Sequence, residues 1–233
     1  MKNMKWLLAL ILVLAVMLAG CAESAEDVAG NVAPTQAATE AAAEENPVSL
    51  GRLEGGVYTN DYAGFGCTLD SSWTFYSAEE LQELPENVNE VLKDTEIGGS
   101  LEGVEQITDM MAENTEMLCS MNVLYQKMDA QTRLVYAMMS DEAIADAMLT
   151  QSDTMIAAYA QAGMDATSME KVTVSFLGDE RIALRTEGTM QDIPFYMVQL
   201  FDFDQGSYSI TMTFTSYLED KTADMLELFY EVD

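Results

Sequence analysis

Apolar and polar residues alternate along several segments of the chain, and this alternation predicts β-strands. Over residues 117–125 every second side chain is apolar, which is typical of a strand that buries one face. Residues 195–203 and 208–215 are two further strand-like segments, and the turn sequence Asp-Gln-Gly-Ser between them predicts a β-hairpin. Strands are also expected over 171–176 and 181–189.

Apolar residues at helical spacing predict helices between these strands. Ser77 and Glu80 have the spacing of a capping box, which opens a helix that Pro85 kinks or breaks. A weaker helical stretch is expected over 102–114, and a long helix over 141–162, where a glycine follows. The apolar residues assigned to helices are Leu81, Leu84, Val88, Val91, Ile144, Met148, Met155, Ile156 and Tyr159, with Met225, Leu226, Phe229 and Tyr230 in a final helix from about residue 218.

These elements predict an α+β fold, in which one antiparallel β-sheet is covered by helices. Two short apolar runs, 57–59 and 65–69, flank a turn over 60–64 and add a second hairpin. Hairpin-connected strands run antiparallel, and the helices between them need a sheet face to pack on. Residues 51–233 contain no repeat of fixed period and no second polar linker, so they are expected to form one domain.

The N-terminus has the pattern of a secretory signal. Lys2 and Lys5 precede an apolar run of 14 residues, 6–19, which is shorter than the ~20 residues that a membrane-spanning helix needs. The sequence Leu-Ala-Gly-Cys that ends at Cys21 resembles the lipobox of bacterial lipoproteins. The resemblance implies a signal peptide over 1–20, diacylglycerol on the Cys21 thiol, and a membrane partner reached through this lipid anchor. An ordinary secretory signal and an uncleaved anchor are the alternatives.

Residues 21–50 are expected to form a disordered acidic tether after the lipidated cysteine. From residue 22 to residue 50 there is no aromatic and no basic residue, while alanine, acidic residues and two prolines dominate. Such a composition cannot bury enough apolar surface to offset the entropy lost on ordering. The tether would therefore hold the domain away from the membrane on its extracytoplasmic face.

The segments Gly-Val-Tyr-Thr-Asn (56–60) and Gly-Phe-Gly-Cys-Thr-Leu-Asp-Ser-Ser-Trp (64–73) resemble the opening of PsbP-like domains. The strand meander and the closing helix are also similar, so the resemblance covers about 51–233. It implies an α/β/α sandwich on an antiparallel sheet. The chain departs from the pattern at 70–72, where a proline before Trp73 would be usual. The resemblance implies little about function, because this fold serves many roles.

Composition excludes several classes of function. The 233 residues include no histidine, which excludes Ser-His-Asp catalysis and imidazole metal sites. The chain has 10 Lys and Arg against 40 Asp and Glu, a formal net charge of −30. This excess argues against nucleic-acid binding, which depends on cations that contact phosphates. In the domain, 34 acidic residues stand against 8 basic ones, so most of the charge must coat the folded part.

Two cysteines remain if Cys21 carries the lipid. Cys67 and Cys119 each fall on an apolar face of a predicted strand. They are either buried free thiols that act as small hydrophobic residues, or one disulfide between neighbouring strands in an extracytoplasmic protein. The separation of their Cα atoms decides between these alternatives.

Asp202 and Asp204 are the weak candidates for a metal site. Their spacing, with a glycine soon after, resembles the start of a calcium loop, but the later EF-hand ligands are missing. A hairpin turn explains the same residues, and a calcium site formed by surface carboxylates is the alternative. Arg181 and Arg185 share one face of a strand and would contact either a small anionic ligand or surface acids.

The expected function is that of a membrane-anchored extracytoplasmic lipoprotein of a bacterial cell envelope. Its domain would act as a non-catalytic module that binds another envelope protein or a small ligand. The alternatives are an envelope enzyme that uses carboxylates and an acidic, cation-binding surface protein. No motif singles out a catalytic residue, since the nucleophile-elbow, phosphate-loop and dinucleotide-binding patterns are all missing.

Overall fold

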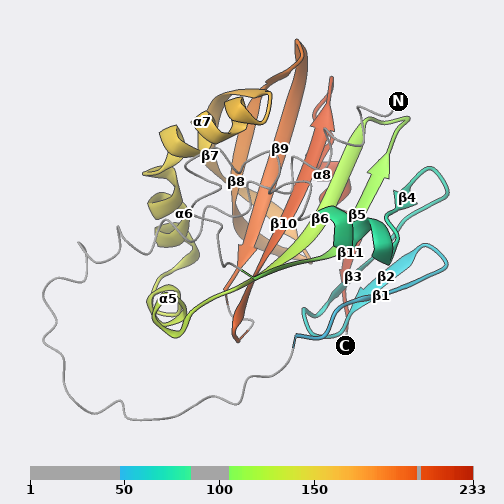
Figure 1. Ribbon diagram of the computed structural model, residues 1–233, viewed down its shortest axis with the longest axis horizontal. Helices are drawn as coiled ribbons and strands as arrows, with labels where there is room; N and C mark the ends of the chain where they lie inside the picture. Colours follow the sequence, from blue (N-terminus) through green and yellow to red (C-terminus); the bar gives the residue numbers. More distant parts are fainter. Residues whose placement is uncertain (1–47, 85–104, 204–205, 233) are drawn as a thin grey trace, which may run out of the picture.

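Two antiparallel β-sheets form the framework of the molecule (Figure 1). The computed structural model describes residues 48–84, 105–203 and 206–232. Within them, the larger sheet has seven strands in the order β4-β5-β6-β10-β9-β8-β7. Its strands are β4 (Thr74–Phe75), β5 (Gln106–Asn114), β6 (Cys119–Lys127), β7 (Met164–Phe176), β8 (Asp179–Met190), β9 (Ile193–Asp202) and β10 (Tyr208–Tyr217).

The smaller sheet packs against one face of the larger one. Its four strands follow the order β1-β2-β3-β11 and are β1 (Arg52–Glu54), β2 (Val57–Asn60), β3 (Phe65–Thr68) and β11 (Phe229–Glu231). Side chains from both sheets meet in one buried cluster, which we call the inter-sheet cluster; it includes Tyr58, Phe65, Val123, Met212 and Phe214. The helix α8 (Thr222–Leu226) contributes Met225 and Leu226 to the same cluster.

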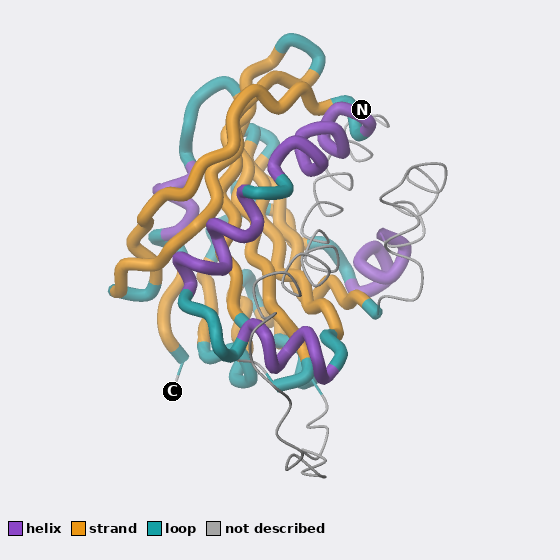
Figure 2. Tube along the Cα trace, turned by 90° about the vertical axis from the view of Figure 1, so that its left-hand side faces the viewer, coloured by secondary structure: helices purple, strands orange, loops and turns teal. Residues whose placement is uncertain are grey.

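Helices lie on the opposite face of the larger sheet (Figure 2). They are α5 (Ala130–Tyr136), α6 (Asp141–Leu149) and α7 (Ser152–Gln161), of which α6 and α7 pack against β7 and α6 also against β8. A second buried cluster forms there; it includes Ile144, Met148, Met155 and Tyr159 from these helices and Leu184 from β8. None of the helices in the described part of the chain is long and apolar enough to cross a membrane.

The antiparallel α+β class predicted from the sequence is confirmed, and so are its hairpins. The run over 57–59 pairs with the run over 65–69 as β2 and β3, and β9 pairs with β10 from Ile210–Asp202 to Tyr217–Phe195. Alternation along β6 is also correct, because Cys119, Met121, Val123 and Tyr125 all face the inter-sheet cluster. The sheet is not single, however, since the N-terminal hairpin pairs with β11 and forms its own sheet.

The helix predicted over 102–114 is wrong, because this segment contains β5. The strand is covered on both faces, with Met110 and Ala112 in the inter-sheet cluster and Met111 in the helix-side cluster. Its register with β6 also shifts between Thr108 and Met110. Burial on two sides together with this bulge removes the alternation that identifies a strand in a sequence.

The helix predicted over 141–162 is two helices, since α6 ends at Leu149 and α7 begins at Ser152. Thr150 turns its hydroxyl back to the carbonyl of Ala147, 2.6 Å away, at the break. Gly163, at a φ of 79°, follows α7 as expected. The sequence did not indicate α5, which Asp129 caps by accepting hydrogen bonds from two backbone N–H groups.

The final helix is shorter than predicted. Only α8 is helical, and Phe229 belongs to β11, where it pairs with Cys67 of β3. Its ring fills the space between the sheets, 5.5 Å from the ring centre of Phe214. The gain from burying this aromatic ring in the inter-sheet cluster outweighs the helical spacing of the sequence.

The capping box predicted at Ser77 and Glu80 is confirmed. The Glu80 carboxylate accepts from the Ser77 backbone N–H at 2.9 Å, and the Ser77 hydroxyl accepts from the Glu80 N–H at 3.3 Å. The predicted kink at Pro85 lies outside the described residues, as do Val88, Val91, the predicted signal peptide, Cys21 and most of the predicted tether. Val48, near the end of the predicted tether, packs against the inter-sheet cluster, so the folded domain begins slightly before residue 51.

Candidate functional site

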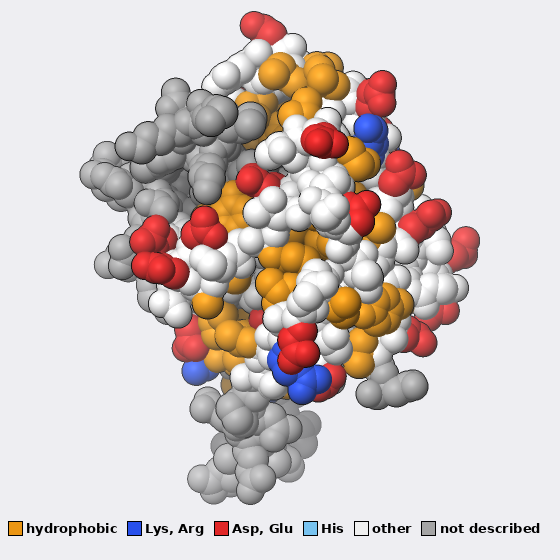
Figure 3. Space-filling view, turned by 90° about the vertical axis from the view of Figure 1, so that its right-hand side faces the viewer, with side chains coloured by type: hydrophobic (Ala, Val, Ile, Leu, Met, Phe, Trp, Pro, Cys, Tyr) orange, Lys and Arg blue, Asp and Glu red, His pale blue; other side chains and the backbone are white. Residues whose placement is uncertain are grey.

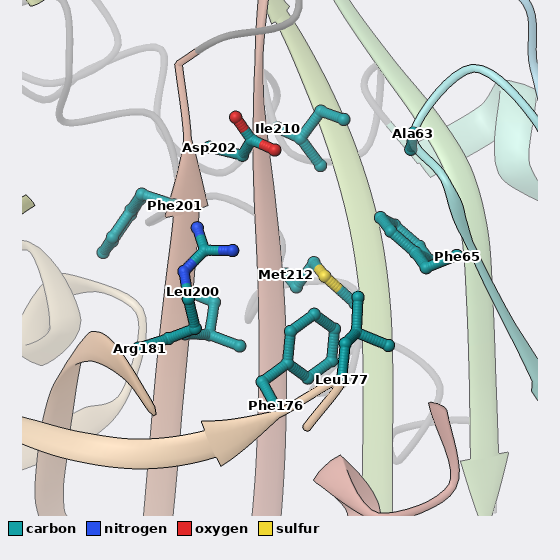
Figure 4. A pocket seen from close by; sticks show the side chains of 10 residues that line it. All are labelled: Ala63, Phe65, Phe176, Leu177, Arg181, Leu200, Phe201, Asp202, Ile210 and Met212. Atoms are coloured by element: carbon teal, nitrogen blue, oxygen red, sulfur yellow. The ribbon is translucent and has the colours of Figure 1, made fainter. Parts of the chain in front are cut away.

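A small pocket opens at one end of the space between the two sheets (Figure 4). Its volume is about 80 Å³. The lining is apolar except for two charged side chains, and it consists of Ala63, Phe65, Phe176, Leu177, Arg181, Leu200, Phe201, Asp202, Ile210 and Met212. Pockets lined by apolar walls with a few placed polar groups are the usual form of a small-molecule site.

The end of a strand ladder places the two charges. The pairing of β8 with β9 ends at Ala183 and Leu200, whose side chains face the inter-sheet cluster. Because side chains alternate along a strand, Arg181 and Asp202 are the next residues on this face. Figure 4 shows the guanidinium and the carboxylate on one side of the pocket, with Phe65, Phe176 and Met212 across from them.

The charge of Arg181 is only loosely neutralised. Its side chain is one-third exposed, and its Nε lies 3.9 Å from a carboxylate oxygen of Asp141, which is beyond hydrogen-bond distance. Such a surface ion pair contributes little to stability. Burial and the charge of Asp202 raise the pKa of the nearby Tyr62, so this phenol stays neutral.

The apolar wall of the pocket is held by a group of phenylalanines. The ring centres of Phe65 and Phe176 are 6.3 Å apart, and Phe229 lies 5.8 Å from Phe65 and 5.7 Å from Phe176. Edge and tilted contacts of this kind stabilise aromatic pairs beyond the area they bury. The aromatic wall of the pocket is therefore part of the folded core.

A partly buried carboxylate on β5 fixes the position of the smaller sheet. Asp109 on β5 accepts hydrogen bonds from the Tyr58 hydroxyl (2.6 Å), the Asn60 side-chain amide (2.6 Å) and the Gly51 backbone N–H (2.8 Å). The oxygen of the Asn60 amide in turn accepts from the backbone N–H of Ala63, a residue of the pocket wall, at 2.8 Å. The Asp109 cluster thus connects the large sheet, the N-terminal hairpin and the pocket.

Burial shifts the titration of this cluster. It raises the pKa of Asp109, although the hydrogen bonds from Tyr58, Gly51 and Asn60 act in the opposite direction. Burial, followed by the charge of Asp109, raises the pKa of Tyr58 and of Tyr125. Both phenols are therefore neutral at physiological pH, and the Tyr58 hydroxyl can donate its proton to the carboxylate. The cluster therefore has a structural role, since its hydrogen bonds hold the N-terminal hairpin against β5.

Only one of the two candidate metal ligands falls within the described residues. Asp202 lines the pocket at the end of β9, and Asp204 lies outside the described residues. Across the ranges that the structure describes, no group of three or more Asp, Glu, Cys or His side chains is placed to hold a metal ion.

The two arginines of β8 have different environments. Arg185 donates to Glu187 at 2.7 Å and to Asp220 at 2.6 Å, and its guanidinium lies 6.0 Å from the ring centre of Tyr196. Arg185 therefore contacts surface acids, which is one of the two alternatives that the sequence left open; the other was a small anionic ligand. Arg181 is the arginine that reaches the pocket.

The two cysteines are free thiols, and both are buried in the inter-sheet cluster. Burial raises the pKa of Cys67 to about 12 and the pKa of Cys119 to about 11. Thiols with such pKa values contain almost no thiolate at neutral pH and are poor nucleophiles. They act as small hydrophobic side chains in this structure.

Neither Cys67 nor Cys119 is expected to react with an aromatic disulfide reagent at pH 8 while the protein is folded, because the two thiols are buried and protonated. The absorbance of the released thiolate measures the reaction, and both residues should react in guanidinium chloride. A Ser49→Cys variant, with the new thiol at an exposed position, is the positive control. Stoichiometric labelling of the folded wild type within minutes would contradict this assignment.

Sequence reasoning singled out Arg181 and Asp202 but not the pocket that joins them. It missed Asp109 entirely, because that residue fell in a segment predicted as helix. The only signal for it was a single acidic residue between apolar ones. The chain matches no protein-family model, and no curated protein matches it.

Proposed function

We propose that this protein is a lipoprotein anchored to the extracytoplasmic face of a bacterial cell membrane, and that its domain binds a small ligand or another envelope protein without catalysis. The observation that carries the anchoring is the apolar run over 6–19 followed by Leu-Ala-Gly-Cys at Cys21. Two or more acyl chains on such a cysteine give stable membrane attachment.

The pocket supports binding over catalysis. Its lining has one carboxylate, Asp202, whereas hydrolysis by carboxylates needs two acids in separate roles. The two described thiols are held protonated by burial, so neither supplies a nucleophile. An apolar wall with Arg181 and Asp202 at its edge offers shape and charge for recognition.

We also propose that the domain is a PsbP-like sandwich. The antiparallel central sheet, the helical layer on one face and the hairpin formed by β2 and β3 support this assignment. The smaller sheet and α8 would then form the layer on the other face. Clear structural alignment with PsbP-like domains, strand by strand, is the comparison that would test it.

The anchor is tested by growing bacteria that express the wild type, Cys21→Ala or Cys119→Ala with labelled palmitate. Label is expected in the wild type and in Cys119→Ala, and none in Cys21→Ala, because Cys21 is the proposed acceptor. Fractionation should place the labelled proteins in the membrane. Equal label in Cys21→Ala, or none in the wild type, would overturn the lipoprotein assignment.

A further inference from the structure

We propose that a groove between the end of β7 and the C-terminal strand β11 binds an extended segment of a partner protein, in which a lysine or arginine lies between apolar residues. The groove has a volume of about 350 Å³ and shares only Leu177 with the pocket described above. Its lining comes from the β7–β8 turn, the end of α8 and β11. The inference rests on the proposed binding function and names the surface and the class of partner for it.

The floor of the groove is apolar and belongs to the folded core. Leu226 and Phe229 are buried in the inter-sheet cluster, and Leu177 packs partly against it. Leu177 is the first residue of the two-residue turn between β7 and β8; its φ is 53°, and that of Gly178 is 86°. Asparagine or glycine adopts this first position with less strain. The turn therefore keeps a leucine at a conformational cost, and its side chain adds an apolar wall to the groove.

Two carboxylates are the charged groups of the groove. Glu227 and Glu231 are exposed, and neither forms an ion pair or a side-chain hydrogen bond with any described residue. Tyr230 lies beside them and is 39% exposed, and the described lining contains no lysine or arginine. An ammonium or guanidinium group is attracted by carboxylates and by the face of an aromatic ring, while its aliphatic stem covers apolar surface. The groove therefore favours a basic side chain over an acidic or an apolar one.

β11 provides backbone contacts for an extended segment. It is the edge strand of the smaller sheet, and within the described residues it pairs with β3 alone. All three residues of β11 line the groove and no residue of β3 does, so the groove lies on the unpaired side of β11. The N–H and C=O groups of an edge strand can pair with an added strand, whose alternate side chains then enter pockets beside it. A free amine would leave these backbone groups unused.

Charge decides which polypeptide fits. Acidic side chains are distributed over the surface, as Figure 3 shows for one face, and the domain has 34 acidic residues against 8 basic ones. A second copy of the domain has the same charge and is repelled. The chain's own segment over 22–50 contains no basic residue, so it lacks the side chain that the groove favours. The partner is therefore a different protein with a basic segment, which the negative potential attracts.

The proposal is tested by methyl NMR on the full chain in micelles of a neutral detergent, with leucine methyl groups labelled. The peptide acetyl-Thr-Val-Lys-Val-Thr-amide is expected to shift the signals of Leu177 and Leu226 and to saturate on titration. The same peptide with glutamate in place of lysine should bind at least tenfold more weakly, because it meets Glu227 and Glu231. A peptide with N-methyl groups on its three central residues should lose as much, because it cannot donate hydrogen bonds to β11. The double variant Glu227→Gln/Glu231→Gln should bind the lysine peptide at least tenfold more weakly, with unchanged leucine signals elsewhere.

Glu116→Gln/Asp192→Asn is the matched control, because it removes two exposed carboxylates from the β5–β6 and β8–β9 turns, outside the groove. Its affinity for the lysine peptide should equal that of the wild type. Equal weakening in the two double variants would mean that the acidic surface attracts the peptide without a site, and would overturn the proposal. Equal binding of the N-methylated peptide, or of acetyl-lysine amide, would show a site for a free cation and not for a strand. If no peptide shifts the two leucine signals, the groove is not the docking surface, while the palmitate experiment decides the anchor separately.

Discussion

Replacement of Asp109 by alanine is expected to lower the free energy of unfolding by about 3 kcal/mol. The substitution removes the acceptor of three hydrogen bonds, from the Tyr58 hydroxyl, the Asn60 amide and the Gly51 N–H. A buried donor left without an acceptor costs about 1–3 kcal/mol, and water entering the partly buried site would offset some of the total. Denaturant titration followed by circular dichroism measures the change.

Asp61→Ala is the matched control, since it also removes one carboxylate, here an exposed one in the turn between β2 and β3. Asp61 pairs with Arg52 at 2.9 Å, and both side chains are more than half exposed, so its loss should cost less than about 1 kcal/mol. Equal losses in the two variants would contradict the role assigned to Asp109.

The same carboxylate gives a pH dependence of known sign. Burial raises the pKa of Asp109 in the folded protein, so the folded state binds its proton more readily than the unfolded state. This contribution to stability is fully present below about pH 3.9, which is the ordinary pKa of an aspartate. It is lost as the pH rises through the raised pKa of Asp109 in the folded protein. Stability relative to Asp109→Asn should therefore increase as the pH falls towards about 4.

The sequence predicted those elements whose apolar and polar residues alternate or whose turns are explicit. The hairpin of β2 and β3 has its glycine-containing turn, β6 alternates cleanly, and β9 and β10 flank a turn sequence. β5 was not predicted because its apolar residues follow one another over 110–112 and because its bulge interrupts the period at Asp109. Local pattern alone could not separate this strand from a helix.

The candidate site was not predictable from the sequence, because its residues come from distant segments. Ala63, Phe176, Arg181 and Met212 belong to the β2–β3 turn, β7, β8 and β10, and only the pairing of strands brings them together. Arg181 could be assigned to a strand face, but nothing in the sequence showed which charge it would meet. Charge composition predicted an acidic surface and not a pocket.

Gly188→Ala is expected to destabilise the domain by about 3 kcal/mol, the upper end of the cost of overpacking. Gly188 on β8 pairs with Ala166 of β7 and Phe195 of β9, beside the bulge in the β7 ladder. A Cβ atom on this glycine would lie 2.2 Å from the carbonyl oxygen of Asp165 and 2.7 Å from the Cα of Ala166. These are backbone atoms, so no side-chain rotation can relieve the clash. β7 must move away from β8, and the backbone hydrogen bonds between them must lengthen.

Gly163→Ala separates this steric effect from the general cost of replacing a glycine. Gly163 has a φ of 79° with open space around the position of a Cβ, so the variant meets torsional strain alone, which costs about 1–2 kcal/mol. Thermal unfolding of the two variants should show a melting temperature lower by about 10 °C for Gly188→Ala and a drop about half as large for Gly163→Ala. The ring of Phe195 lies 2.8 Å from the same Cβ position and belongs to the helix-side cluster, so the disturbance extends into that core. A melting temperature for Gly188→Ala within 2 °C of the wild type, roughly the effect of half a kcal/mol, would show that β7 can yield at its bulge without loss of packing.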